Sequence, residues 1–452
     1  MNTVKVIGAG LAGSEATLQL AKRNINVKLY EMRPKKTTGA HLTGNCAEFV
    51  CSNSLGSYDL TNASGLLKHE MEILGGELIR IAKENSVPAG NALAIAREDF
   101  SKAVNKRISE FPNIELIREE ITEIPEGNVI IASGPLTSEK FAESIKQFTK
   151  SEHLHFFDAI APIVEVDSID FNKAFWGSRY DKGEASYINC PMNREEYEKF
   201  YNILINSPRI EQHDIDKDAR FFESCLPVEV LASRGVDTLR FGPMKPVGLV
   251  DKRTGIENYA VVQLRQDNSA KTLFNLVGFQ TNLKWGAQKE LVHSIPGLEN
   301  ANIVRYGVMH RNTFINASQV LEPTFETKAR EGLFFAGQIT GTEGYTESIA
   351  GGLLAGINMY RRITGQDTLI FPQETMLGAI AHYITDKAHL AHISKRDGSL
   401  RYLPPQPINS NWAIVAPMEL SKQERKNKKL KTELLSNRAI HSMKVFSDNL
   451  NA

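Results

Sequence analysis

The first thirty residues alternate between short apolar runs and one helical pattern. An apolar run at 4–7 leads into the glycine cluster Gly8–Gly13, and apolar residues then recur at helical spacing as far as Ala21. A second apolar run, residues 26–31, ends in the acid Glu31. This order predicts a compact β-α-β unit that ends in an acid where such units place one.

The same style of pattern returns later in the chain. Further strands are predicted at 114–121, 128–135 and 332–338, and helices at 65–85 and 348–358. Residues 32–64 are irregular and rich in Gly, Thr and Asn, and a loop of this length in a compact domain is usually functional.

The strand-helix alternation weakens between residues 137 and 304, where aromatic residues and prolines are scattered through loops. We therefore expect an α/β protein in which an α+β domain, residues 137–304, is inserted between two parts of the first domain. Those parts are expected at 1–136 and at 305–452, the second with a basic C-terminal helix.

The glycine cluster has the G-x-G-x-x-G spacing of a dinucleotide-binding loop. In such loops Gly8 permits the tight turn, Gly10 lets the backbone approach a pyrophosphate, and Gly13 lets helix and strand pack closely. Glu31 stands where a carboxylate would accept hydrogen bonds from the adenosine ribose. The residues predicted to bind the cofactor here are Gly8, Ala9, Gly10, Leu11, Ala12, Gly13 and Glu31.

This unit alone does not distinguish FAD from NAD, but two later strand-turn segments favour FAD. Residues 129–134 and 333–338, with a helix after Gly344, are placed as in chains that wrap an extended FAD. The second helix would point its positive end at the flavin. We therefore expect residues 1–136 and 305–452 to form a Rossmann-like FAD-binding domain of the glutathione-reductase type, with 137–304 as the inserted substrate-side domain. The predicted cofactor residues of these segments are Gly134, Gly337, Gln338, Gly344 and Tyr345.

The charge balance of the chain does not by itself predict a polyanionic partner. Among 452 residues, 53 are Lys or Arg and 53 are Asp or Glu. A local basic cluster lies near the C-terminus, and either RNA phosphates or solvent could neutralise it. It comprises Lys422, Arg425, Lys426, Lys428, Lys429 and Lys431, with Glu424 among them.

Cysteine content and hydropathy predict a cytoplasmic protein that does not enter a membrane. No apolar run approaches the roughly 20 residues that span a bilayer, and the N-terminus begins directly with a strand. Four cysteines without C-x-x-C spacing predict neither a disulfide framework nor a metal site. An isolated cysteine is usually a small buried side chain, so spacing does not raise Cys51 or Cys225 above Cys46 or Cys190.

Six blocks in order carry a resemblance that covers nearly the whole chain. They are 6–16, 29–34, 50–55, 237–249, 306–314, and 336–338 together with 343–345. On these blocks the chain resembles the folate- and FAD-dependent tRNA (uracil-5-)-methyltransferase family, TrmFO, with its GidA/TrmFO-like fold.

The resemblance implies an enzyme that forms 5-methyluridine in the T-loop of tRNA. It implies that 5,10-methylenetetrahydrofolate supplies the carbon, that FAD carries and reduces it, and that NADPH or NADH supplies electrons. By motif, Cys225 matches the thiolate that attacks carbon 6 of uracil, and Cys51 matches the group that removes the carbon 5 proton. Tyr345, near the flavin, could stack on folate or on a base, or it could cap the helix or pack in the core. No metal and no obligate protein partner are expected.

Three alternatives stay open at this point. The same chemistry could act on a uridine of 23S ribosomal RNA. A related FAD enzyme modifies the wobble uridine of tRNA with a partner protein, and a non-catalytic FAD-binding RNA chaperone is a third class. Two positions depart from the family pattern, since Gly56 stands where arginine is usual and Ser224 where glycine is usual. Glycine at position 56 lacks the positive charge of arginine beside the expected active-site loop, and this difference leaves the identity of the bound RNA open.

Overall fold

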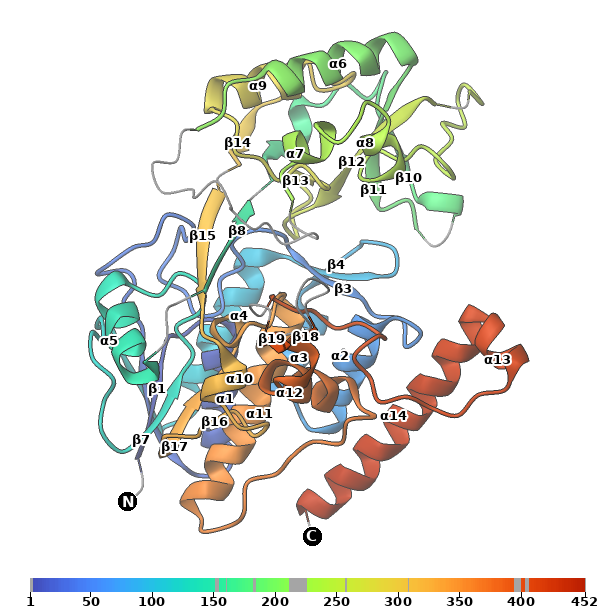
Figure 1. Ribbon diagram of the computed structural model, residues 1–452. Coiled ribbons are helices and arrows are strands. Elements are labelled where there is room, and N and C mark those ends of the chain that lie inside the picture. Colours follow the sequence, from blue (N-terminus) through green and yellow to red (C-terminus); the bar gives the residue numbers. More distant parts are fainter. Residues whose placement is uncertain are drawn as a thin grey trace.

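Two six-stranded sheets form the framework of the molecule, one in each of two bodies stacked in Figure 1. The computed structural model describes residues 3–451 except 151–153, 160, 182–183, 211–225, 257, 308, 394–399 and 403–405. The lower body contains both ends of the described chain, and the upper body is built from its middle third.

The first sheet is mainly parallel and has the order β16-β17-β7-β1-β2-β6. Only the short β16 runs antiparallel to its neighbour. Its strands are β1 (Thr3–Ile7), β2 (Asn26–Tyr30), β6 (Ile114–Ile117), β7 (Asn128–Ile131), β16 (Glu326–Thr327) and β17 (Arg330–Phe335). The predicted β-α-β unit is confirmed, whereas the strand predicted at 114–121 ends four residues early.

Helices α1 (Leu11–Ala21) and α11 (Tyr345–Ile363) pack on each other and against strands of this sheet. The same body also contains α2 (Ala63–Ile73), α3 (Glu77–Glu84), α4 (Arg97–Ser109), α5 (Glu139–Thr149), α10 (Ala317–Val320) and α12 (Met376–Thr385). The single helix predicted at 65–85 is wrong. The chain breaks there because Gly75 adopts a φ of 71°, in the left-handed region that ends helices.

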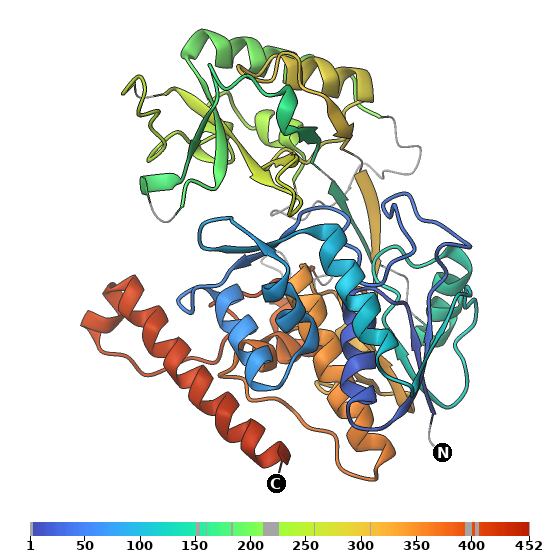
Figure 2. The same ribbon diagram turned by 180° about the vertical axis from the view of Figure 1, so that it is seen from behind.

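The second sheet is antiparallel, with the order β10-β11-β12-β13-β9-β14. Its strands are β9 (Ile163–Glu165), β10 (Phe175–Gly177), β11 (Tyr187–Met192), β12 (Ala260–Gln266), β13 (Leu273–Leu276) and β14 (Ile303–Arg305). Its helices are α6 (Arg194–Asn206), α7 (Val228–Ala232), α8 (Thr238–Phe241) and α9 (Trp285–His293). Helices α6 and α9 lie on the side away from the first body, as both views show (Figures 1 and 2).

Two strands join the bodies. β8 (Leu154–Ala159) and β15 (Met309–Phe314) pair antiparallel and cross the gap side by side (Figure 1). Helix α5 follows residue 137 in the sequence, but it packs Phe141 and Ile145 into the core of the first body. The expected α/β class with a second, inserted sheet is confirmed, and the expected domain limits stay a prediction.

A three-stranded sheet lies beside the junction, formed by β3 (Ser54–Ser57), β5 (Ala92–Ile95) and β4 (Ser86–Val87). The C-terminal part adds β18 (Ala391–Ile393), β19 (Leu400–Tyr402), α13 (Lys422–Lys426) and α14 (Lys428–Asn451). Helix α14 packs on α2 and buries Ala439 and Met443, whereas the basic residues of α13 and the start of α14 are exposed. Among the described helices, none is both long and apolar enough to cross a membrane.

Candidate active site at the meeting of two cavities

A cleft opens at the carboxyl ends of β1, β2, β7 and β17, where open parallel sheets bind their ligands. It encloses about 990 Å³ of space between protein atoms, counting the part open to solvent, which suits a cofactor. Nine of the predicted cofactor residues line it: Gly8, Gly10, Leu11, Ala12, Glu31, Gly134, Gly337, Gln338 and Tyr345.

The first glycine loop has the geometry of a pyrophosphate-binding turn. A Cβ added to Gly13 would lie 1.8 Å from the carbonyl oxygen of Gly8, so only glycine lets α1 approach the turn. A Cβ added to Gly10 would meet no protein atom within 4 Å, and Gly10 lines the cleft. The first intrahelical bond runs from Ser14 N to Gly10 O (2.9 Å), so the earlier amides stand at a helix N-terminus. These residues fit a bound dinucleotide phosphate.

Three predicted cofactor residues support the cleft without lining it. Ala9 donates its N–H to Glu31 (3.0 Å), Gly13 packs on Gly8, and Gly344 is the N-cap of α11. Helix α11 begins at Tyr345, three residues earlier than predicted, so its N-terminus reaches the cleft.

Glu31 is buried and already has a partner that the sequence did not reveal. The Arg33 guanidinium donates to both carboxylate oxygens (2.9 and 3.1 Å), and the amides of Arg33 and Ala9 donate one bond each at 3.0 Å. Burial alone would raise the pKa of Glu31, but these hydrogen bonds and the charge of Arg33 lower it. Four donors fill the lone pairs of a carboxylate, so a ribose hydroxyl would have to displace one Arg33 bond.

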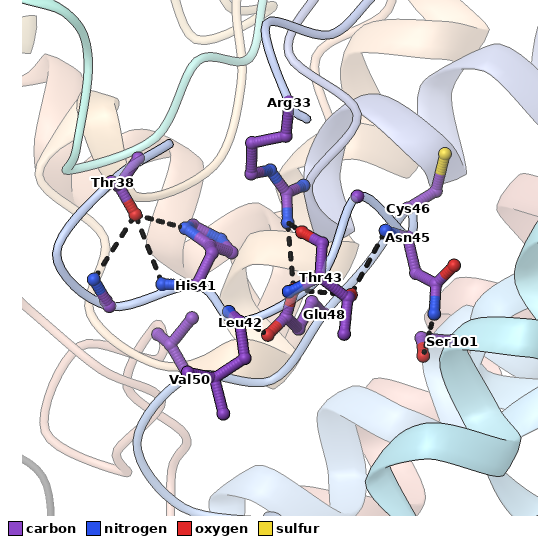
Figure 3. A network of polar contacts seen from close by, with 12 residues as sticks. Arg33, Thr38, His41, Leu42, Thr43, Asn45, Cys46, Glu48, Val50 and Ser101 are labelled. Atoms are coloured by element: carbon purple, nitrogen blue, oxygen red, sulfur yellow. Dashed lines mark hydrogen bonds and ion pairs between the residues drawn. The ribbon is translucent and has the colours of Figure 1, made fainter. Parts of the chain in front are cut away.

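The irregular segment after β2 forms one wall of the cleft, and Glu48 organises it (Figure 3). Its carboxylate accepts from Leu42 N (2.8 Å), from Thr43 Oγ1 (2.8 Å) and from Arg33 (3.0 Å). Nearby, Thr38 Oγ1 lies 2.7 Å from His41 Nδ1. Sequence reasoning missed these lining residues individually, although the length of the irregular segment indicated a functional loop.

Cys51 and Tyr345 meet at the end of this wall. The Sγ of Cys51 lies 2.9 Å from the Tyr345 hydroxyl, which also accepts the amides of Cys51 (2.7 Å) and Val50 (3.1 Å). Phe49 packs against the Tyr345 ring, with centroids 4.3 Å apart. The alternative of core packing for Tyr345 is thus partly realised, but the ring also lines the cofactor cleft.

A second cavity lies on the other side of Cys51, between the two bodies. It holds about 860 Å³, counting the part open to solvent, and its lining includes Cys51, Ser52, Leu226, Arg265 and Gly278. Cys225 itself falls in 211–225, outside the described residues. Leu226, the next residue in the chain, lines the same cavity as Cys51.

Two arginines hold the Cys51 segment from opposite bodies. Arg97 of α4 donates to Cys51 O (2.7 Å) and Phe49 O (3.1 Å), and it pairs with Asp267 (2.8 Å). Arg265 of β12 donates to Ser52 Oγ (2.7 Å) and to Asn53 Oδ1 (2.9 Å).

Asn53 completes this contact. Its amide donates to Ile95 O (2.9 Å) and Gln266 O (2.7 Å), and its oxygen also accepts from Asn275 (3.1 Å). The side chain is fully buried, so the segment next to Cys51 is fixed to both bodies.

The other two described cysteines lie away from this junction. Cys46 is buried, and burial raises the pKa of its thiol to about 11. Cys190 is buried in the core of the second sheet, and burial raises the pKa of its thiol as well. Both therefore stay neutral thiols near neutral pH.

Comparisons with known proteins agree with this architecture. Residues 3–367 match the family described as Glucose inhibited division protein A. Two relatives bear the name methylenetetrahydrofolate--tRNA-(uracil-5-)-methyltransferase TrmFO. The protein of Anoxybacillus flavithermus is 54% identical over 447 residues, which cover 99% of this chain and 100% of that protein. The protein of Bacillus subtilis is 53% identical over 448 residues, 99% of each chain.

Among solved structures, Aquifex aeolicus GidA superposes on the chain with a TM-score of 0.69. The match covers 99% of this chain and 73% of the GidA chain at 17% sequence identity. At that identity the likeness shows the fold alone.

Proposed function

The chain belongs to the TrmFO family of methylenetetrahydrofolate–tRNA-(uracil-5-)-methyltransferases, and on this premise we propose that it methylates carbon 5 of a T-loop uridine in tRNA. Its cofactors are FAD and 5,10-methylenetetrahydrofolate, with NADPH or NADH as the electron source. The observation that carries the proposal is the position of Cys51, which lines the second cavity while its Sγ lies 2.9 Å from the hydroxyl of Tyr345, a residue that lines the cofactor cleft.

The chemistry needs two side-chain roles. Carbon 5 of uracil is a poor nucleophile until a thiolate adds to carbon 6, and we assign that addition to Cys225 from the family motif. The new C–S bond places electron density on carbon 5, which then forms its bond to the one-carbon unit. Cys51 removes the carbon 5 proton, and the electron pair left on carbon 5 expels the nitrogen that carried the one-carbon unit, which leaves an exocyclic methylene. Once hydride has reduced that methylene, the electron pair returned to carbon 5 expels the Cys225 thiolate from carbon 6. FAD, when bound, would supply the transfer of the one-carbon unit and this hydride.

The residues of this chain bind and orient the reactants. The glycine loop and the α1 amides would hold the pyrophosphate of FAD, and the wall around Glu48 closes the side of the cleft. The second cavity takes the uracil ring, which must leave its stack to reach Cys51. The exposed basic residues at 422–431 supply phosphate contacts away from the reacting atoms.

The first experiment supplies the purified yellow protein with methylenetetrahydrofolate and NADPH. Unmodified tRNA and 23S ribosomal RNA fragments are offered in parallel, and 5-methyluridine is measured by nucleoside mass spectrometry. We expect product on tRNA, and loss of at least about 10³-fold in rate for Cys225→Ala and Cys51→Ala. Cys190→Ala is the matched control, because that thiol is buried away from the site and its loss should leave turnover nearly unchanged.

The other outcomes separate the alternatives. Product on ribosomal RNA alone would keep the chemistry and replace the substrate. A different modified uridine that requires a partner protein would indicate a wobble-uridine enzyme. RNA binding with no product would leave a non-catalytic flavoprotein, and full activity of Cys225→Ala would overturn the assigned nucleophile.

A further inference from the structure

The Tyr345 hydroxyl has more partners than a packing role requires. Tyr345 is the first residue of α11, and its phenolic oxygen lies within hydrogen-bonding distance of three groups of Val50 and Cys51. The amides of Cys51 and Val50 donate to it at 2.7 and 3.1 Å, and Cys51 Sγ lies at 2.9 Å.

The donor and acceptor capacity of a phenol fixes the direction of the third bond. A phenolic oxygen offers two acceptor lone pairs and one O–H donor. The two backbone amides can only donate, so they use both lone pairs. The remaining O–H must then point at the sulfur, and Cys51 Sγ is the acceptor.

We infer that Tyr345 is a positioning residue that holds Cys51 as a thiolate by donating its O–H to the sulfur. When Cys51 ionises, the thiol proton leaves to solvent and Tyr345 keeps its own. A hydrogen bond donated to the charged form favours that form over the neutral thiol. The inference rests on the proposed function, in which Cys51 accepts the carbon 5 proton, and it names the group that prepares Cys51 for that step.

The surrounding charges also favour the thiolate form of Cys51. The charged groups that approach this segment from neighbouring elements are Arg97 of α4, Arg265 of β12, Arg305 of β14 and Asp267. Asp267 is paired with Arg97, so the net charge of these three arginines and one aspartate is positive. Burial, followed by the nearby Cys51, raises the pKa of Tyr345 well above its usual range, so its O–H stays available at neutral pH.

The position of Tyr345 also couples the two cavities. Tyr345 lines the cofactor cleft, while its hydroxyl contacts the sulfur of Cys51, the residue that lines the second cavity. The same side chain therefore sets the protonation state of Cys51 and its distance from the cleft.

The test measures ionisation of Cys51 directly, without turnover. The purified flavoprotein is alkylated with iodoacetamide over a range of pH, and mass spectrometry follows the peptide that contains Cys51. In Tyr345→Phe we expect the midpoint pH of alkylation to rise by at least about one unit, with a rate near neutral pH about tenfold lower. Wild-type protein stripped of FAD serves as the reference if the variant loses its flavin.

Thr346→Val is the matched control. Thr346 is the next residue of α11 and ties the same helix start to the same segment through Leu55 O (2.8 Å), but it is not a partner of the sulfur. Its variant should keep the wild-type midpoint. An unchanged midpoint in Tyr345→Phe, or an equal shift in both variants, overturns the inference. Because alkylation needs no RNA, this result is independent of whether 5-methyluridine is formed.

Discussion

The cofactor cleft and the second cavity, which Cys51 lines, are neighbours through the contact of Cys51 with Tyr345 but are built in different ways. The cleft includes the turns that follow β1, β7 and β17, where the spacing between neighbouring residues sets the geometry. The second cavity depends on side chains that meet across the fold, such as the bond from Arg265 to Asn53, 212 residues apart. We therefore expect substitutions that add side-chain atoms to disturb the cofactor cleft most. Substitutions that remove side-chain atoms should disturb the second cavity most.

Alanine at Gly13 should have the largest effect on the protein. The new Cβ would lie 1.8 Å from Gly8 O, so α1 must move away from the turn. We expect more than about 4 kcal/mol to be lost from the free energy of unfolding, beyond the usual range for overpacking, together with loss of bound flavin. Urea unfolding and flavin absorbance measure the two effects.

Gly10→Ala separates the effect on cofactor binding from the effect on the stability of the protein. Its Cβ would meet no protein atom within 4 Å but would project where the pyrophosphate is expected. Apoprotein stability should stay within about 0.5 kcal/mol of wild type, whereas FAD affinity falls. Equal destabilisation by both alanines would contradict the distinction between a packing glycine and a ligand-facing one.

The ion pair between Glu31 and Arg33, which both line the cleft, gives the next largest effect. Glu31→Gln removes one of the two carboxylate partners of the buried Arg33 guanidinium, since Glu48 remains, and should cost about 3 kcal/mol at neutral pH, the low end for a broken buried pair. The folded-state pKa of Glu31 is lowered, so the unfolded chain takes up a proton first as the pH falls below about 4.3. The wild type therefore loses this stability as the pH falls through the folded-state pKa, and the two proteins should converge in acid.

Urea unfolding of both proteins over a series of pH values would measure this convergence. Glu115→Gln is a suitable control, because its ion pair with Lys28 is long (3.6 Å) and exposed and should matter little at any pH. If the difference in the free energy of unfolding between Glu31→Gln and wild type stayed constant as the pH fell, the negative charge of Glu31 would not be the cause of that difference.

The two regions also differ in how far sequence could predict them. The glycine loop and its helix follow from local spacing, so most of the predicted cofactor residues line the cleft. The partner of Glu31 was not foreseen, because an arginine two residues away gives no periodic signal. The break at Gly75 was missed because helical spacing continues on both sides of it.

The long-range contacts could not be predicted from one sequence. Nothing near Asn53 indicates that Arg265 and Asn275 would reach it, since that contact depends on how two sheets from distant segments are stacked. Tyr345 was expected at the cofactor, but its bond to Cys51 appears only once α11 is placed against the irregular segment. The role of Cys225 still rests on the family motif.

Truncation of Asn53 should give the smallest of these effects on stability, yet a clear one on turnover. Asn53→Ala removes its four side-chain hydrogen bonds, although Arg265 keeps Ser52 and Asn275 keeps Asp267 as partners. The loss should cost about 2 kcal/mol of the free energy of unfolding. The cleft lies on the other side of Cys51, so the flavin content should stay at the wild-type level. Because the bond between Arg265 and Ser52 is then the remaining side-chain hydrogen bond from β12 to the segment around Cys51, methylation should fall more than stability does.

Asn172→Ala, at an exposed asparagine of the inserted body, is the control and should leave all three quantities unchanged. Stability by urea unfolding, flavin by absorbance and 5-methyluridine by mass spectrometry are measured on the same preparations. If Asn53→Ala lost flavin in proportion to activity, the two cavities would form one cooperative unit. Retained flavin with slowed methylation would instead show that the side-chain contacts between the bodies position the reacting segment without supporting the cofactor.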